Sequence, residues 1–217
     1  MDCSIIIPNY NYSQYLGEAI ESALGQTLKC EIIVVDDCST DDSIKVALKY
    51  PVNIIQRTEN KGLGAARNLG IKAAKGNWIL PLDSDDLIHP RFIEKTLGQG
   101  DVVGTGLEEF ENSNKKYLPP SNLKWQDFLE HNRLYGTTLF RKSLWEKVGG
   151  YREGLAGYED WDFWLRLAYA GAEINIVREY LFFYRKHGKS MITDVKANHE
   201  KHFEILKKNN PSIYGGL

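Results

Sequence analysis

Three carboxylates follow directly on an apolar segment in the stretch ILPLDSDDLIHP, residues 79–90. Like charges this close repel and resist burial, so Asp83, Asp85 and Asp86 need a positive charge to offset them. Asp83 and Asp85 are two positions apart, and at an extended strand end their side chains lie on the same side. Carboxylate oxygens suit Mg²⁺ or Mn²⁺, which often bridge to substrate phosphates. A divalent cation with a phosphorylated ligand is one interpretation, and a helix N-cap formed by Ser84 or Asp86 is the other.

The elements that must position these carboxylates are short apolar runs that alternate with helical patterns. This alternation predicts an α/β fold with a mostly parallel central sheet flanked by helices. In such sheets, ligands bind outside the carboxyl ends of the strands. Asn9, Asp37 and Asp83 each follow a predicted strand, so we expect one site at that edge. The predicted strands are 4–8, 31–37, 52–56, 77–82 and 101–105, and the predicted helices of this half are 15–24, 43–50 and 63–74.

The second half of the chain is richer in tryptophan and tyrosine, and its predicted elements are less regular. No internal repeat or low-complexity linker interrupts the sequence, so we expect a single domain over residues 1–217 with a nucleotide-type half and a variable half. The predicted elements are helices 143–151 and 158–171, strands 174–177 and 181–184, and a closing amphipathic helix 192–208.

Composition and charge exclude several classes of function. Hydrophobic residues make up 42% and charged residues 26% of 217 residues, which are ordinary globular values. A net charge of −2 leaves no polycationic footprint for nucleic acid. Cys3 and Cys30 open apolar runs and are expected to pack as small core residues in a reducing compartment. Without a signal-peptide pattern or a membrane-spanning stretch, we expect a cytoplasmic protein, which a lipid-linked substrate could bring to the inner face of the membrane.

The usual phosphate-binding loops do not match this sequence. There is no GxxxxGK[ST] pattern, and no GxGxxG pattern follows the first predicted strand. The glycine-rich stretch NKGLGAARNLG, residues 60–70, follows the third strand instead. It can still open a helix whose amides and Arg67 face an anion, although Arg67 could equally be an ordinary ion-paired residue.

Five segments, in this order, resemble the glycosyltransferases of family 2, an inverting group with the GT-A fold. One segment alone would be weak evidence because two aspartates in a DxD pattern are common, but together the segments run over nearly the whole chain. They are SIIIPNYNYSQYLGEAIESALGQT, EIIVVDDCSTDDS, NKGLGAARNLGIKAAKGNWILPLDSDD, GTTLFRKSLWEKVGGYREGLAGYEDWDFWLRLAYAG and FYRKHGKSM.

The resemblance implies roles for residues of the first half. Pro8, Tyr10 and Asp37 would border the nucleotide base, with Asp37 accepting a hydrogen bond from the uracil N–H, although Asp37 could also cap the turn that follows its strand. Arg67 would lie near the donor phosphates or brace the loop. The DxD pair would be Asp83 and Asp85, with Asp85 the direct metal ligand and Asp86 a helper.

The resemblance also implies roles in the second half. His187 would bind the metal or a phosphate, in a flap over the pyrophosphate that includes Arg185 and Ser190, although its position alone also fits a solvated loop histidine. Asp160 would be the catalytic base and Glu159 a positioning residue. Position alone also fits a simpler role for these two acids, because carboxylates in a first helical turn complement the helix dipole.

The function implied is metal-dependent, inverting transfer of a hexose or N-acetylhexosamine. The expected donor is a nucleotide-diphospho-sugar, in particular a UDP-sugar, the acceptor a hydroxyl of a glycan or lipid-linked saccharide, and the cofactor Mn²⁺ or Mg²⁺. A sugar-phosphate nucleotidyltransferase and an inactive nucleotide-sugar-binding module are the alternatives. The expected division is a nucleotide-sugar-binding half at 1–100, an acceptor-side half at 101–190 and a C-terminal helix at 191–217.

Overall fold

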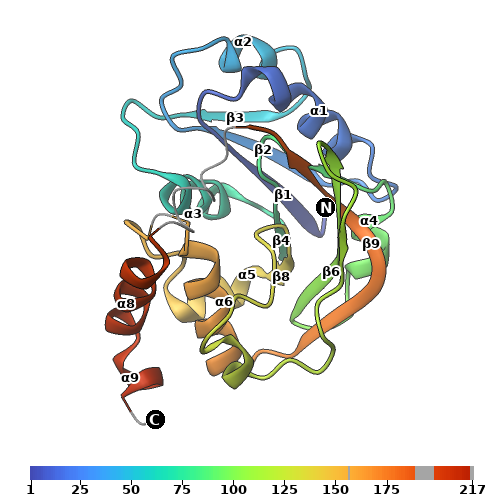
Figure 1. Cartoon of the computed structure of the whole chain (residues 1–217). Helices are drawn as coiled ribbons and strands as arrows, with labels where there is room; N and C mark the ends of the chain where they lie inside the picture. Colours follow the sequence, from blue (N-terminus) through green and yellow to red (C-terminus); the bar gives the residue numbers. More distant parts are fainter. Residues whose placement is uncertain (156, 189–197, 216–217) are drawn as a thin grey trace.

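A nine-stranded sheet forms the centre of the computed structural model, which describes residues 1–155, 157–188 and 198–215 (Figure 1). In the first half, strands and helices alternate as predicted. These elements are β1 (Cys3–Asn9), α1 (Ser13–Leu24), β2 (Glu31–Asp36), α2 (Ser43–Ala47), β3 (Asn53–Gln56), α3 (Leu63–Ala73), β4 (Trp78–Pro81), β5 (Leu87–Ile88) and α4 (Phe92–Thr96).

The second half completes the sheet and adds a group of helices beside it. Its elements are β6 (Val102–Glu111), β7 (Lys116–Tyr117), the 3₁₀ helix η1 (Trp125–Phe128), β8 (Leu139–Arg141), α5 (Lys142–Val148), α6 (Glu159–Tyr169), β9 (Ile174–Lys186), α8 (His199–Asn209) and α9 (Pro211–Tyr214).

The strand order is β3-β2-β1-β4-β8-β6-β9-β5, with β7 paired to β6. The first four strands in this order are parallel, which places their carboxyl ends at one edge. β8 then pairs antiparallel with both β4 and β6, while β6 and β9 run parallel. The predicted α/β class is therefore confirmed, and the sheet is parallel where it carries the first half and mixed beyond β4.

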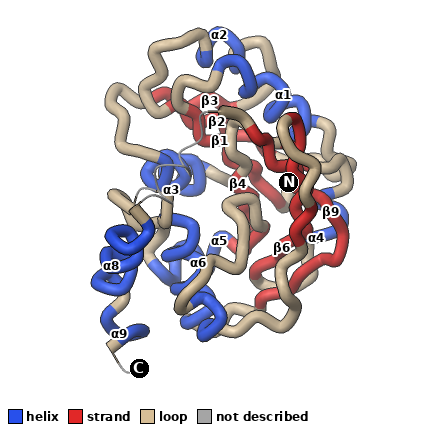
Figure 2. Tube along the Cα trace, viewed as in Figure 1, coloured by secondary structure: helices blue, strands red, loops and turns tan. Residues whose placement is uncertain are grey.

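The apolar runs are continuous because the parallel strands are buried on both faces. Ile6 of β1 packs in one core cluster with residues of α3 and α6, whereas Ile5 and Ile7 pack in the other with residues of α1. Figures 1 and 2 show α1 and α2 on one side of these strands and α3 on the other. A Cβ atom on Gly70 would lie 2.4 Å from Ile6 Cγ2, so the glycine is what allows α3 to pack closely on β1.

Several predicted boundaries change in the structure. The predicted strands 174–177 and 181–184 are one strand, β9, because its long pairing with β6 absorbs the register shifts near Gly106. The predicted strand 101–105 extends to Glu111 for the same reason. The closing helix is described from His199 to Asn209, and 192–197 lie outside the described residues.

Two expectations from composition can also be compared with the structure. Cys3 is buried as expected, whereas Cys30 is only partly buried, because its side chain lies at the edge of the core. Within the described ranges, no helix combines the length and the apolar character needed to cross a bilayer.

Candidate active site

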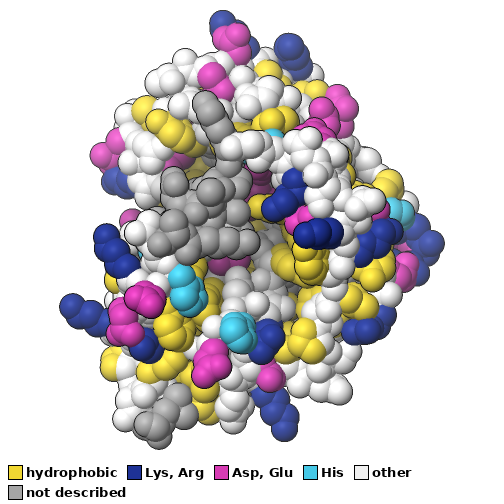
Figure 3. Space-filling model, in the orientation of Figure 1, with side chains coloured by type: hydrophobic (Ala, Val, Ile, Leu, Met, Phe, Trp, Pro, Cys, Tyr) yellow, Lys and Arg dark blue, Asp and Glu magenta, His cyan; other side chains and the backbone are white. Residues whose placement is uncertain are grey.

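A cavity of about 750 Å³ opens at the carboxyl ends of β1, β2 and β4 (Figure 3). Its position agrees with the rule for parallel sheets, and residues far apart in the sequence line it together. His187 is not part of the lining but contacts Asp85. The predicted site residues in the lining are Pro8, Tyr10, Asp37, Arg67, Asp83, Asp85, Asp86, Glu159 and Asp160.

Arg67 joins the two acidic motifs across the middle of the cavity. Its Nη2 donates to Asp83 Oδ1 at 2.7 Å and its Nη1 donates to Glu159 Oε1 at 2.8 Å. The arginine is 1% exposed, in the first half of α3. Burial alone would lower the pKa of Arg67, but Asp83 and Glu159 raise it, so the guanidinium stays charged. This buried cation is part of the offset that the carboxylates after β4 require.

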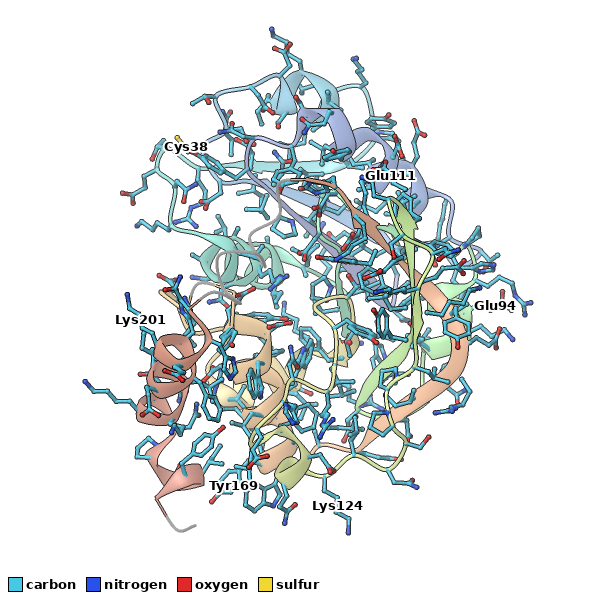
Figure 4. All side chains as sticks on the ribbon, in the orientation of Figure 1. Cys38, Glu94, Glu111, Lys124, Tyr169 and Lys201 are labelled. Atoms are coloured by element: carbon cyan, nitrogen blue, oxygen red, sulfur yellow. The ribbon has the colours of Figure 1, made fainter. Side chains whose placement is uncertain are left out.

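Arg185 provides a second cation behind the same carboxylates. Its backbone N–H donates to Asp86 Oδ1 at 2.8 Å, and its Nε donates to the carbonyl oxygen of Asp85 at 2.7 Å. Its guanidinium also pairs with Glu18 of α1 and with Glu111 at the end of β6, which Figure 4 labels. Arg185 therefore anchors the 83–86 segment through the carbonyl oxygen of Asp85 and the carboxylate of Asp86. It is not among the residues that line the cavity, so it is not placed to bind a phosphate there.

Asp86 differs from its neighbours because it is 1% exposed. Burial, together with the charges of Asp85 and Asp83, raises its pKa well above the ordinary value. Its carboxylate accepts a hydrogen bond from the Arg185 backbone N–H, so the geometry gives Asp86 an anchoring role.

Asp85 and His187 meet at the open side of this segment. His187 Nε2 lies 2.9 Å from Asp85 Oδ2, and its ring lies 5.0 Å from the ring of Tyr15. Burial raises the pKa of Asp85, the charge of Asp83 adds to this, and the hydrogen bond with His187 opposes it. Ser190, the other residue of the predicted flap, lies outside the described residues.

The donor set fits a metal that takes few ligands from the protein. Within the part of the chain that the structure describes, no three His, Cys, Asp or Glu side chains converge as a metal cage. Arg67 pairs with Oδ1 of Asp83, and Asp85 Oδ2 lies 2.9 Å from His187 Nε2, so Asp83 Oδ2, Asp85 and His187 are the candidate ligands for a cation. Mg²⁺ and Mn²⁺ are commonly bound in this way, by one or two carboxylates plus substrate phosphates and water.

Asp160 faces the cavity at the start of α6, beside the buried Glu159. Asp160 Oδ2 accepts a hydrogen bond from Asn132 Nδ2 at 3.0 Å, and Oδ1 accepts one from the Trp161 backbone at 2.6 Å. Burial, with the charge of Glu159, raises the pKa of Asp160 to about 7. A carboxylate with this pKa can take up a proton at neutral pH. Glu159 is paired with Arg67, and it cannot take up a proton without losing that ion pair.

Asp37 lies at the other end of the cavity, where its carboxylate is already engaged. Gly62 N donates to Oδ2 at 2.7 Å, Lys61 N lies 3.2 Å from both oxygens, and Arg57 Nη1 lies 3.2 Å from Oδ1. Asp37 thereby fixes the loop that begins α3. Recognition of a uracil N–H by Asp37 stays a prediction, and Tyr10, which is 45% exposed, lines the same cavity.

Two contacts of the candidate site had no signal in the sequence. Asn132 lies in a loop without periodicity, and only the fold brings it to Asp160. Arg57 follows β3 and reaches Asp37 because β3 pairs with β2. The sequence around Asn132 and Arg57 contains no motif that marks either residue.

A family model described as glycosyl transferase family 2 matches residues 4–149, which is more than half of the chain. The chain belongs to glycosyl transferase family 2. A second model, described as the N-terminal domain of galactosyltransferase, matches residues 122–190. The family match covers the strand ends, Arg67 and the DxD segment, and the second match covers Glu159, Asp160 and His187.

Relatives and solved structures agree with membership of family 2. An uncharacterized glycosyltransferase of Rickettsia typhi is 34% identical, over 94% of this chain and 69% of its own length. One of Haemophilus influenzae is 28% identical, over 95% of this chain and 76% of its own length. The crystal structure of S. aureus TarS 1-349 in complex with UDP-GlcNAc is similar with a TM-score of 0.75 and 25% identity, over 89% of this chain. This chain spans 61% of that TarS chain.

The GT-A fold and the glycosyltransferase class are thus shown for this chain. The roles of individual residues stay predictions.

Proposed function

We propose that this protein transfers a sugar, with inversion, from a nucleotide-diphospho-sugar to an acceptor hydroxyl, with help from a divalent cation. The observation that carries the proposal is the placement of Asp160 and Asp85 in one cavity, on opposite sides of the Arg67 bridge. Inverting transfer needs a base on one side of the anomeric carbon and charge stabilisation for the diphosphate on the other.

The donor would lie along the carboxyl ends of β1, β2 and β4. Pro8 and Tyr10 would border the base, and the loop that Asp37 fixes would close that end. The similarity to TarS, whose structure contains UDP-GlcNAc, supports a uridine nucleotide as the first donor to test. Asp85 and His187 would hold Mn²⁺ or Mg²⁺, which supplies the positive charge that stabilises the leaving diphosphate.

Asp160 would accept the proton of the attacking hydroxyl. Its raised pKa fits this task, and Asn132 orients its carboxylate. Arg67 would keep Glu159 and Asp83 charged and at a fixed separation, so that the base and the donor keep their relative position. The acceptor would be a hydroxyl of a glycan or a lipid-linked saccharide.

The test is a screen of nucleotide sugars with Mn²⁺ for release of nucleoside diphosphate, which needs no acceptor. We expect slow release from one donor, dependence on the cation, and loss of release in Asp160→Asn with nucleotide affinity unchanged. Asp42→Asn, an exposed aspartate distant from the cavity, is the matched control. Binding without release for every donor would favour the inactive module, and release of pyrophosphate from a nucleoside triphosphate would favour the nucleotidyltransferase.

A further inference from the structure

The cavity continues past the predicted donor site to a wall that the proposed function leaves unused. Strands β6 and β9, with β7 and the loop 132–136, supply this wall. Figure 3 shows hydrophobic side chains on the β6 and β9 side of the hollow. We define the aromatic wall as Leu107, Glu109, Tyr117, Tyr135, Phe182, Tyr184 and Lys186.

Strand geometry explains why these side chains share one face. Phe182, Tyr184 and Lys186 are alternate residues of β9, so they point to the same side of the sheet. Leu107 pairs with Phe182, and Glu109 pairs with Tyr184, which puts the two strands' cavity faces next to each other.

Aromatic rings cover much of this surface. The rings of Tyr135 and Phe182 lie 5.9 Å apart, and those of Phe182 and Tyr184 lie 6.2 Å apart. Burial raises the pKa of Tyr135 to about 12, so its hydroxyl remains a hydrogen-bond donor at neutral pH. A surface of apolar rings with polar tips suits a ligand that has apolar ring faces and hydroxyl edges, as a pyranose does.

The charges beside the aromatic wall argue against an anionic acceptor, whereas the donor diphosphate would have the proposed divalent cation as its partner. Among the described lining residues, Arg67 and Lys186 are the basic ones, and acidic residues outnumber them. Arg67 is paired with Asp83 and Glu159, and Lys186 lies 3.5 Å from Glu109. Among the described lining residues, an acceptor that carries phosphates or uronates would therefore find no basic side chain without an acidic partner. It would lose its hydration without gaining an ion pair.

We propose that the aromatic wall is the acceptor subsite and that it binds an uncharged saccharide, with one sugar ring packed on Tyr184. The sugar would take the face of this ring opposite Lys186, whose Nζ lies 5.2 Å from the ring centroid. This inference rests on the proposed function and adds the class of acceptor to it. The loop 132–136 supplies Tyr135 of the wall and also Asn132, which donates to Asp160, so a saccharide seated on the wall presents hydroxyls toward the base.

The experiment measures binding of the full chain, with UDP and Mn²⁺, to an array of immobilised neutral oligosaccharides and of their phosphorylated and uronate-containing counterparts. We expect binding to neutral members. Tyr184→Ala should weaken that binding about tenfold, while Tyr184→Phe, which keeps the ring, should stay within about threefold. Tyr180→Ala is the matched control, because Tyr180 is an exposed tyrosine of the same strand outside the cavity lining.

Preference for phosphorylated or uronate-containing members would overturn the proposal, as would Tyr184→Ala that binds like the parent, or no binding to any neutral member. A separate titration with UDP and Mn²⁺ distinguishes the two levels of inference. Failure of the parent protein to bind UDP or any other nucleoside diphosphate contradicts the proposed function, whereas UDP binding together with one of the overturning results on the array contradicts the aromatic wall alone. Equal UDP affinity in Tyr184→Ala shows that the variant is folded.

Discussion

The central arginine of the cavity offers the sharpest test of how the site is held together. Arg67→Met keeps the length of the side chain but removes its charge and its hydrogen bonds to Asp83 and Glu159. Both carboxylates then lose their cation, and Glu159 is left buried at 5% exposure. Removal of one partner from a buried ion pair costs about 3–5 kcal/mol, because an uncompensated charge remains.

The assay is urea unfolding of the parent protein and of two variants at pH 8. Arg91→Met is the matched control, since Arg91 pairs with Glu94 at the surface with side chains 50% and 38% exposed. Such a pair contributes about 0–1 kcal/mol. We therefore expect Arg67→Met to lower the free energy of unfolding by at least about 2 kcal/mol more than Arg91→Met does.

The pH dependence provides an independent check. Without Arg67, the folded-state pKa of Glu159 rises further above its unfolded value, so the folded protein binds more protons than the unfolded chain. The penalty should then be small at low pH, where the carboxyl is protonated, and grow as the pH rises. Glu159→Gln in the Arg67→Met background should recover part of the loss. Equal losses for Arg67→Met and Arg91→Met at every pH would refute the reasoning.

Three further predictions follow from single contacts. Because the pKa of Asp160 is raised to about 7, its ionisation costs the parent protein stability as the pH rises from about 4 to 7. Asp160→Asn should therefore raise the free energy of unfolding by about 1–2 kcal/mol at pH 8 and leave it unchanged near pH 3. Urea titrations at both pH values measure this difference. Asp85→Asn should weaken Mn²⁺ binding in the presence of UDP about tenfold or more by calorimetry while the fold survives; unchanged affinity would remove Asp85 from the metal site. Gly70→Ala should destabilise the protein by about 1–3 kcal/mol in thermal unfolding, because its Cβ would lie 2.4 Å from Ile6 Cγ2, whereas Gly188→Ala, with open space around it, should not.

Local patterns in the sequence were sufficient for the parallel half of the fold. Continuous runs such as Ile5–Ile7 are buried on both faces, which is typical of strands in a parallel sheet. The rule that ligands bind at the carboxyl ends of parallel strands then placed Pro8, Asp37 and Asp83 around one cavity. These inferences succeed because each depends on residues close in sequence.

Only the tertiary structure decided which partners these side chains take. Arg67 could have been a surface residue, and it became the bridge between Asp83 and Glu159 because α3 packs on β1 and β2 and also contacts α6. The two adjacent acids Glu159 and Asp160 separate for the same reason: one reaches Arg67, while the other faces the cavity and Asn132.

Pairings across long stretches of chain also lay beyond the sequence. β9 is one strand because β6 pairs along it, and that pairing sets both the aromatic wall and the position of Arg185 behind Asp85 and Asp86. Periodicity reports which face of an element is apolar, but it does not specify the element that covers this face. The strand ends and their carboxylates are therefore properties of the sequence, and the charge pairing that makes them a site is a property of the fold.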